Sequence, residues 1–217
     1  KCTGCHFNAG ANGNPALFGP GAGNLNFATG VEDLPDQPAQ TIDPDTPADD
    51  GFGVPGNGEF NIPPVVEAAD TPPFFHNNSV ATLEGAIAFY NGAAFNESPA
   101  GQLIIGATGS GISLEASQVD AVAQFLRALN VLENLRESIA LLQRAESASR
   151  SRVRRLVERA GFEIDDAVEV LTQGNLHLDV RDDLVSVAAR LERRPLRYAG
   201  AIDRLRRARD EITGGGS

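Results

Sequence analysis

Apolar residues recur at helical spacing in several separate stretches of this 217-residue chain, and the pattern predicts a mainly helical protein. The first stretch covers residues 82–90, where Leu83, Ile87 and Tyr90 share one face. The Asn-Gly pair that starts at Asn91 is expected to end this helix. One side of a short helix can therefore be buried here.

A second helix is expected to start at Ser117, as its N-cap, because Asp120 follows three positions later. Its apolar face continues at i, i+3, i+7 and i+10 with Val119, Val122, Leu126 and Leu129. From about residue 131 the composition changes to Leu, Ala, Arg and Glu. Five apolar stripes then predict a helical tail, at residues 132–142, 153–157, 164–171, 184–191 and 202–205.

Residues 7–72 show neither a helical nor an alternating period for long, and Gly, Pro, Asn and Asp are frequent among them. Prolines in 60–79 also exclude a continuous helix. The prediction is an all-α protein with long irregular loops. It divides into a first domain at 1–130, a helical C-terminal extension at 131–213 and a flexible tail at 214–217.

Charge separates the same two regions. Residues 1–129 contain two basic and fourteen acidic residues, a net charge of −12, whereas residues 130–217 carry +1. The acidic region argues against binding nucleic acid, whose phosphates it would repel. It could steer a basic redox partner, or it could simply keep the protein soluble. No run of apolar residues is long enough to predict a membrane span.

The chemistry is concentrated in the first six residues, where Cys2, Cys5 and His6 form C-x-x-C-H, the attachment motif of c-type haem. Each thiol can form a thioether bond to one vinyl group of the same porphyrin. His6 is then placed to bind the iron as proximal axial ligand. The motif predicts one covalent haem c and a cytochrome-c-like first domain. The phenylalanines of the loops, Phe52 among them, are expected to contact the porphyrin.

Three other interpretations of the motif compete. A structural zinc site normally needs four Cys or His ligands, and only His76 and His177 remain to complete one. A redox-active dithiol belongs at a strand-to-helix turn of a βαβ unit, which the pattern does not predict. A structural disulfide would leave the adjacent histidine unexplained.

The sixth position of the iron has no obvious ligand, because the chain contains no methionine. The remaining candidates are His76, His177, Tyr90 and Tyr198. His177 is expected to be a surface or helix-start residue, and Tyr90 could also be an ordinary core aromatic with its hydroxyl hydrogen-bonded.

The stretch Thr71-Pro-Pro-Phe-Phe-His76-Asn-Asn-Ser followed by Thr82-Leu-Glu, downstream of Cys2-Thr-Gly-Cys-His, resembles the second haem domain of bacterial di-haem cytochrome c peroxidases, a family that includes MauG. The family block reads T-x-P-Y-x-H-D-G-S and then T-L-E. Asn77-Asn78 replaces its Asp-Gly. The resemblance covers about residues 1–130 and does not extend to the helical tail.

The resemblance implies roles for four residues. The family's distal ligand, methionine in ordinary peroxidases and tyrosine in MauG-like members, lies fourteen residues after the block's histidine, which is Tyr90 here. His76 is then a residue near the haem rather than an iron ligand. Backbone carbonyls of Thr71 and Pro73 correspond to ligands of a calcium ion, although these residues could equally form a simple proline turn.

The resemblance also implies the function: an electron-relay half of a MauG-like enzyme that uses hydrogen peroxide to oxidise a partner. Peroxide would react at an upstream haem domain, on the same or another chain. Because the motif starts at residue 2, we expect Lys1 not to be the natural start. The redox partner would be a cytochrome, a cupredoxin or a protein substrate, in the periplasm or another extracytoplasmic compartment. The alternatives are a non-enzymatic electron-transfer module of a larger complex and an ordinary di-haem peroxidase.

Overall fold

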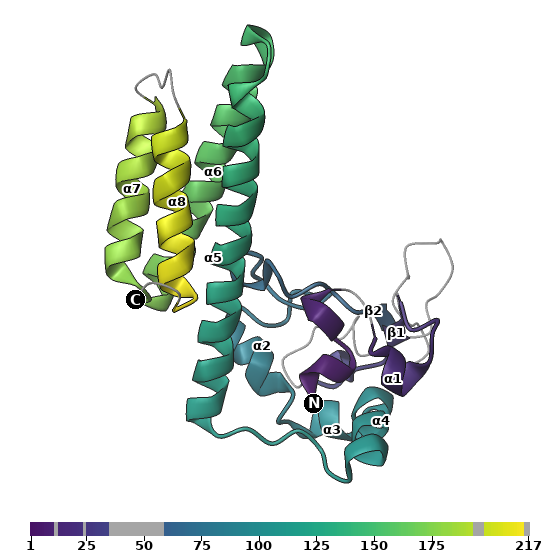
Figure 1. Cartoon of the computed structure of the whole chain (residues 1–217). Helices are drawn as coiled ribbons and strands as arrows, with labels where there is room; N and C mark the ends of the chain where they lie inside the picture. The colour runs from purple at the N-terminus through teal and green to yellow at the C-terminus, as the bar shows by residue number, and fades with distance from the viewer. Residues whose placement is uncertain (11–12, 24, 35–58, 193–197, 215–217) are drawn as a thin grey trace. The chain divides into compact units, whose positions relative to one another are not determined.

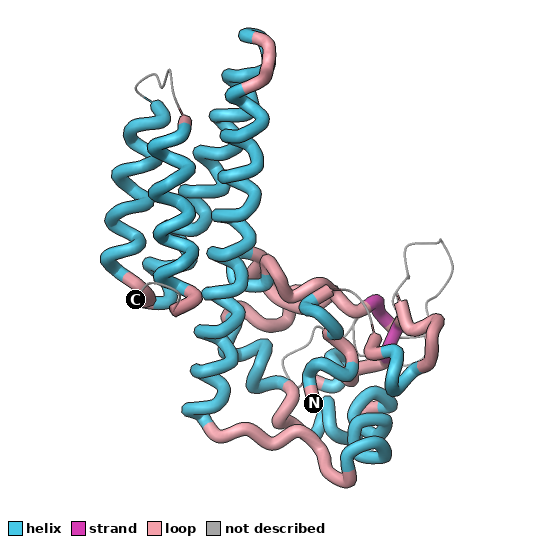
Figure 2. The backbone as a smooth tube through the Cα atoms, viewed as in Figure 1, coloured by secondary structure: helices cyan, strands magenta, loops and turns pink. Residues whose placement is uncertain are grey.

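The computed structural model describes residues 1–10, 13–23, 25–34, 59–192 and 198–214. These residues are mostly helical, which confirms the predicted all-α class (Figures 1 and 2). The chain divides into two compact units, Lys1–Ala123 and Gln124–Ser217. Helix α5 (Ala116–Glu146) continues through the division, so the composition change near residue 131 falls inside a helix. None of the described helices combines the length and apolar character that crossing a bilayer requires.

Unit Lys1–Ala123 is built from short elements joined by irregular segments (Figure 2). Its only strands among the described residues are β1 (Asn26–Phe27) and β2 (Phe60–Asn61), which pair antiparallel. Before the start of α5 its helices and 3-10 turns are η1 (Cys2–Gly4), η2 (Phe7–Ala9), α1 (Pro15–Phe18), η3 (Val31–Asp33), η5 (Ala68–Asp70), α2 (Leu83–Phe89), α3 (Ala93–Glu97) and α4 (Pro99–Thr108). The turn signals between residues 35 and 53, and Phe52, lie outside the described residues.

Capping residues set the helix limits in this unit. Helix α2 begins after Thr82, whose side chain accepts a hydrogen bond from the Gly85 N–H, and this confirms the predicted short helix. Helices α3 and α4 lack a clear apolar period and were not predicted. The N-cap assignment of Ser117 was wrong, because α5 already includes Ala116. Gln118 Oε1 accepts the Glu115 N–H instead, which is the backward bond of a capping box.

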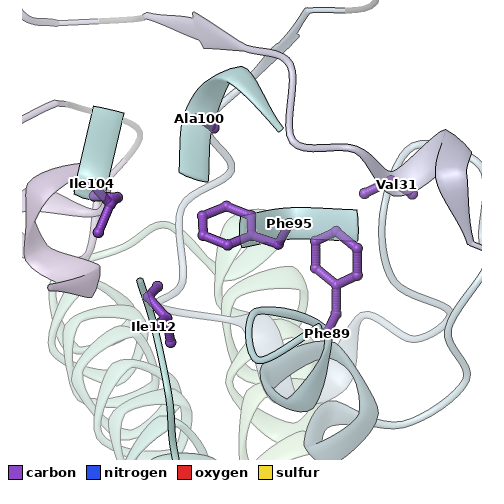
Figure 3. Close-up of a cluster of buried hydrophobic side chains, with 6 residues drawn as sticks. All are labelled: Val31, Phe89, Phe95, Ala100, Ile104 and Ile112. Carbon is purple, nitrogen blue, oxygen red and sulfur yellow. The ribbon is translucent and has the colours of Figure 1, made fainter. Parts of the chain in front are cut away.

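The core of this unit gathers buried side chains from α2, α3, α4 and the segments around them (Figure 3). Phe89 and Phe95 pack edge to face, with ring centroids 6.0 Å apart. Gly30 has φ 74° and lies against α3, where an added Cβ would be 2.1 Å from the Ala94 carbonyl oxygen. The cluster consists of Val31, Phe89, Phe95, Ala100, Ile104 and Ile112.

Unit Gln124–Ser217 comprises the rest of α5 and three further helices, α6 (Arg150–Gly174), α7 (Leu178–Glu192) and α8 (Ala199–Ile212). The second and third predicted stripes belong to one helix, α6, which continues through the single glycine between them, Gly161. Helix α7 packs on both α6 and α8, and the Ser138 hydroxyl of α5 donates to the Ala160 carbonyl of α6. The largest fully buried side chains in this unit include Leu135, Leu141, Leu142, Ile164, Leu171, Leu184 and Leu205.

Candidate haem-binding site

The C-x-x-C-H motif folds as a tight turn. Cys2–Gly4 is 3-10 helical, and the N–H groups of Cys5 and His6 both donate to the Cys2 carbonyl oxygen, at 3.2 and 2.9 Å. Side chains at i and i+3 of a 3-10 turn point to the same side, so the two thiols face one direction. Both cysteines are free. Burial, and then the Cys2 thiol, raises the pKa of Cys5, which keeps its thiol protonated.

His6 is oriented by one backbone contact. Its Nδ1 lies 3.2 Å from the carbonyl oxygen of Pro63, a group that can only accept, so Nδ1 carries the hydrogen. Burial lowers the pKa of His6, partly opposed by this hydrogen bond, and the ring is neutral at pH 7. Nε2 then keeps its lone pair, and no hydrogen bond to it is found among the described residues. This is the tautomer and the orienting bond that a metal-binding histidine needs.

An apolar hollow of about 190 Å³ opens beside Cys5. Its two leucines, Leu17 and Leu103, are each 52% exposed, so the lining leaves apolar surface that a ligand could cover. The volume is below the roughly 300–1,000 Å³ of typical ligand pockets, so the described residues would enclose only part of a porphyrin. The lining consists of Cys5, Leu17, Phe18, Phe27, Ala100, Leu103, Ile104 and Ala107.

Tyr90 follows the last residue of α2 and packs on the core of Figure 3. Its ring meets that of Phe95 edge to face, with centroids 4.7 Å apart. Burial, followed by the nearby thiols of Cys2 and Cys5, raises the pKa of Tyr90 to about 12. The two cysteines raise this pKa through charge repulsion when they are ionised, so the phenol lies within electrostatic range of the attachment motif.

His76 is engaged with other partners. Its Nε2 lies 2.9 Å from Glu32 Oε1, and its ring stacks on Phe60 at a centroid distance of 3.5 Å and an angle of 7°. Burial tends to raise the pKa of Glu32, but the hydrogen bond and charge of His76 outweigh it and lower that pKa. Binding iron through Nε2 would break the pair with Glu32. The geometry therefore favours the role near the haem over the role of ligand.

The predicted calcium ligands, Thr71 and Pro73, are exposed residues between η5 and the bridge that pairs Phe74 with Val80. The Thr71 hydroxyl lies 3.4 Å from the carbonyl oxygens of Glu67 and Ala68. The described residues contain no group of three or more His, Cys, Asp or Glu side chains suited to a metal. A site made of backbone carbonyls would not include such a group, so the calcium assignment stays a prediction.

The two other candidate ligands belong to the second unit. His177 is exposed just before α7, as expected for a helix-start residue, and Tyr198 is buried at the start of α8.

Sequence reasoning missed several residues of the site. The Pro63 carbonyl that orients His6 lies 57 positions away in sequence, and no local pattern points to it. Asn96 was not considered, although its side chain bonds to the Tyr90 carbonyl. Asn91 was interpreted only as a helix end. The sequence gives no local signal for Asn96, because Glu97 and Ser98 follow it and it reads as a surface asparagine.

Comparison with protein-family models, with curated proteins and with solved structures finds no match to this chain.

Proposed function

We propose that this chain is a c-type haem redox protein, the electron-relay half of a MauG-like di-haem enzyme that uses hydrogen peroxide to oxidise a partner protein or donor. The observation that carries the haem assignment is the contact between His6 Nδ1 and the Pro63 carbonyl oxygen. It leaves Nε2 as a ligand beside two thiols that face the same way. A structural disulfide would not require an oriented histidine with a free Nε2 beside the two thiols.

Different residues of the chain would bind the porphyrin, bind the iron and exclude water. Cys2 and Cys5 would hold the porphyrin through thioether bonds, and His6 would bind the iron. Tyr90 is the candidate for the second protein ligand. The apolar side chains around Cys5, Leu103 among them, would help to exclude water from the ring. Bound haem supplies a one-electron Fe(III)/Fe(II) couple. Phenolate is a hard anionic donor and favours the ferric state, which suits a store of oxidising equivalents.

The remaining parts of the proposal rest on the family resemblance. Peroxide reduction is assigned to an upstream haem domain, and Thr71 and Pro73 would provide carbonyls to a calcium ion. The electrons would come from a cytochrome, a cupredoxin or a side chain of a partner protein. Covalent haem attachment would place the protein in the periplasm or another extracytoplasmic compartment. The acidic residues of the first unit would steer a basic partner.

The test is expression of the full chain with a c-type haem attachment system. Haem should remain bound after denaturation, and changing Cys2 and Cys5 to alanine should abolish that attachment. An intact motif that acquires no covalent haem would refute the assignment. Replacing Tyr90 with phenylalanine in the haem-loaded chain should give a five-coordinate or His-ligated spectrum. An unchanged spectrum would eliminate Tyr90 as ligand and leave the haem assignment standing.

A second candidate is a non-enzymatic electron-transfer module, with the helical extension as an assembly domain. It is favoured by the compactness of Gln124–Ser217, which has its own buried core and no cysteine. A second C-x-x-C-H upstream in the full gene would support the di-haem enzyme, whether MauG-like or an ordinary peroxidase. Its absence would favour the module.

A further inference from the structure

Two asparagine side chains near Tyr90 hold an extended segment in the way a neighbouring β-strand would. Asn96 Oδ1 accepts the Ile112 N–H at 2.9 Å, and Asn96 Nδ2 donates to the Ile112 carbonyl at 3.2 Å. Asn91 makes the same pair of bonds with Leu114, at 2.8 and 3.0 Å. Residues two apart in an extended chain present their polar groups on the same side, so both asparagines bind one edge of the segment.

Asn96 also holds Tyr90. Its Nδ2 donates to the carbonyl oxygens of Tyr90 and Gly92, both at 3.1 Å, in addition to that of Ile112. An amide nitrogen has two hydrogens, so three acceptors share them and converge on one side chain. The neighbouring ring of Phe95 packs on the Tyr90 ring. Asn96 therefore restrains the backbone of Tyr90, and Phe95 restrains its side chain.

The other end of the segment is bound to the attachment motif. Lys1, directly before Cys2, donates from Nζ to the Ser110 carbonyl and hydroxyl oxygens and to the Gly111 carbonyl, at 2.8, 2.7 and 2.6 Å. All three ammonium hydrogens have an acceptor there, just beyond the carboxyl end of α4, where a cation is favoured. Gly111 has no room for a side chain, because a Cβ would lie 2.4 Å from Asn96 Oδ1.

We infer that residues 110–114 form a brace between the two sides of the haem pocket, and that Asn96 is the residue through which the brace positions Tyr90 for iron binding. This inference rests on the proposed function, since it assumes that Tyr90 is the distal ligand. Tyr90 and Cys2 are far apart in sequence, and Tyr90 ends a helix of only seven residues. Such a short helix gives little rigidity of its own.

The test compares Asn96→Ala with the matched control Asn91→Ala in the haem-loaded full chain. Both variants lose the two bonds to the segment, but only Asn96→Ala loses the bond to the Tyr90 carbonyl. Asn96→Ala should lower the ratio of tyrosine-ligated to unligated ferric haem about tenfold or more, whereas Asn91→Ala, which loosens only the segment, should lower the ratio by less. Lys1→Ala should shift the ratio in the same direction as Asn96→Ala. Equal spectra for both asparagine variants, or no effect of Lys1→Ala, would overturn the inference.

A haem-free measurement separates this inference from the proposed function. In a Tyr198→Phe background, Tyr90 is the only tyrosine, and the chain has no tryptophan. Acrylamide should quench Tyr90 emission at least twofold more strongly in Asn96→Ala than in Asn91→Ala, at a temperature where both are folded by circular dichroism. Equal quenching would overturn the positioning role. If quenching differs but Tyr90→Phe leaves the parent haem spectrum unchanged, the brace stands as a device that orders Tyr90, and the ligand assignment fails.

Discussion

Replacing Gly101 with alanine should push helix α4 away from helix α3. A Cβ at Gly101 would lie 2.1 Å from the Phe95 carbonyl oxygen and within 2.9 Å of two backbone atoms of Asn96. These atoms belong to the main chain and cannot rotate away, so the two helices must separate. Because α4 provides Ala100, Leu103, Ile104 and Ala107 to the hollow beside Cys5, that hollow would change shape as well.

The size of the effect follows from a control on the same helix. Gly106 has nothing within 4 Å of its would-be Cβ, so Gly106→Ala gains only helix propensity, about 0.5–1 kcal/mol. Gly101→Ala gains the same propensity but adds an overpacking term of about 1–3 kcal/mol. The difference between the two variants isolates that term. We expect it near the upper end, because backbone atoms cause the clash.

Urea unfolding followed through Tyr90 emission, in a Tyr198→Phe background, reports on unit Lys1–Ala123. Gly101→Ala should unfold at lower urea concentration than the parent, and Gly106→Ala at higher concentration, with similar slopes. A midpoint for Gly101→Ala at or above that of Gly106→Ala would refute the close packing of α4 on α3. Equal urea midpoints for the parent, Gly101→Ala and Gly106→Ala would also refute that close packing.

Three further predictions concern stability. Against the opposing effect of burial, the hydrogen bond from His76, together with a backbone hydrogen bond and the His76 charge, holds the pKa of Glu32 below its ordinary value of 4.5, so the pair should stabilise the fold above that value and lose that effect as pH falls. Glu32→Gln should cost about 0.5–1 kcal/mol near pH 7 and progressively less as the pH falls below 4.5, by urea unfolding. Leu184 is fully buried and Val185 is half-exposed. Leu184→Ala should destabilise the second unit by about 2–5 kcal/mol, whereas the control Val185→Ala should change its stability by near zero, both measured by thermal unfolding with circular dichroism. Asn134→Leu should be neutral or stabilising by about 1 kcal/mol in the same assay, because buried Nδ2 of Asn134 has no hydrogen-bond partner among the described residues.

The sequence was sufficient to predict the long helices. Apolar positions such as Leu135, Ile164 and Leu184 repeat over many turns, and all three are fully buried. Periodicity divided α5 and α6 into two apolar stripes each, although both helices are continuous. Neither helix contains a glycine or proline at the point of division, except Gly161 inside α6. An isolated glycine lowers helix propensity without ending a helix that tertiary packing supports.

Short elements held by tertiary contacts could not be predicted. Helices α3 and α4 have five and ten residues, and their positions depend on capping by Ser98 and on close approach at Gly101. The brace at 110–114 has no strand partner among the described residues, and asparagine side chains make the bonds that a neighbouring strand would make. The contact between His6 and Pro63 joins distant residues through a backbone carbonyl, which has no side-chain signature.

The structure adds a physical condition to the assignment of Tyr90. With a pKa of about 12, Tyr90 is a neutral phenol at pH 7, and forming its phenolate there costs about 7 kcal/mol. A neutral methionine ligand would carry no such cost, so a tyrosine at this position binds only a strongly positive centre such as ferric iron. Burial is the largest cause of the raised pKa, and Cys2 and Cys5 are smaller causes that act only when their thiols are ionised. A ferric ion bound by Tyr90 would therefore have to offset mainly the cost of burying the phenolate.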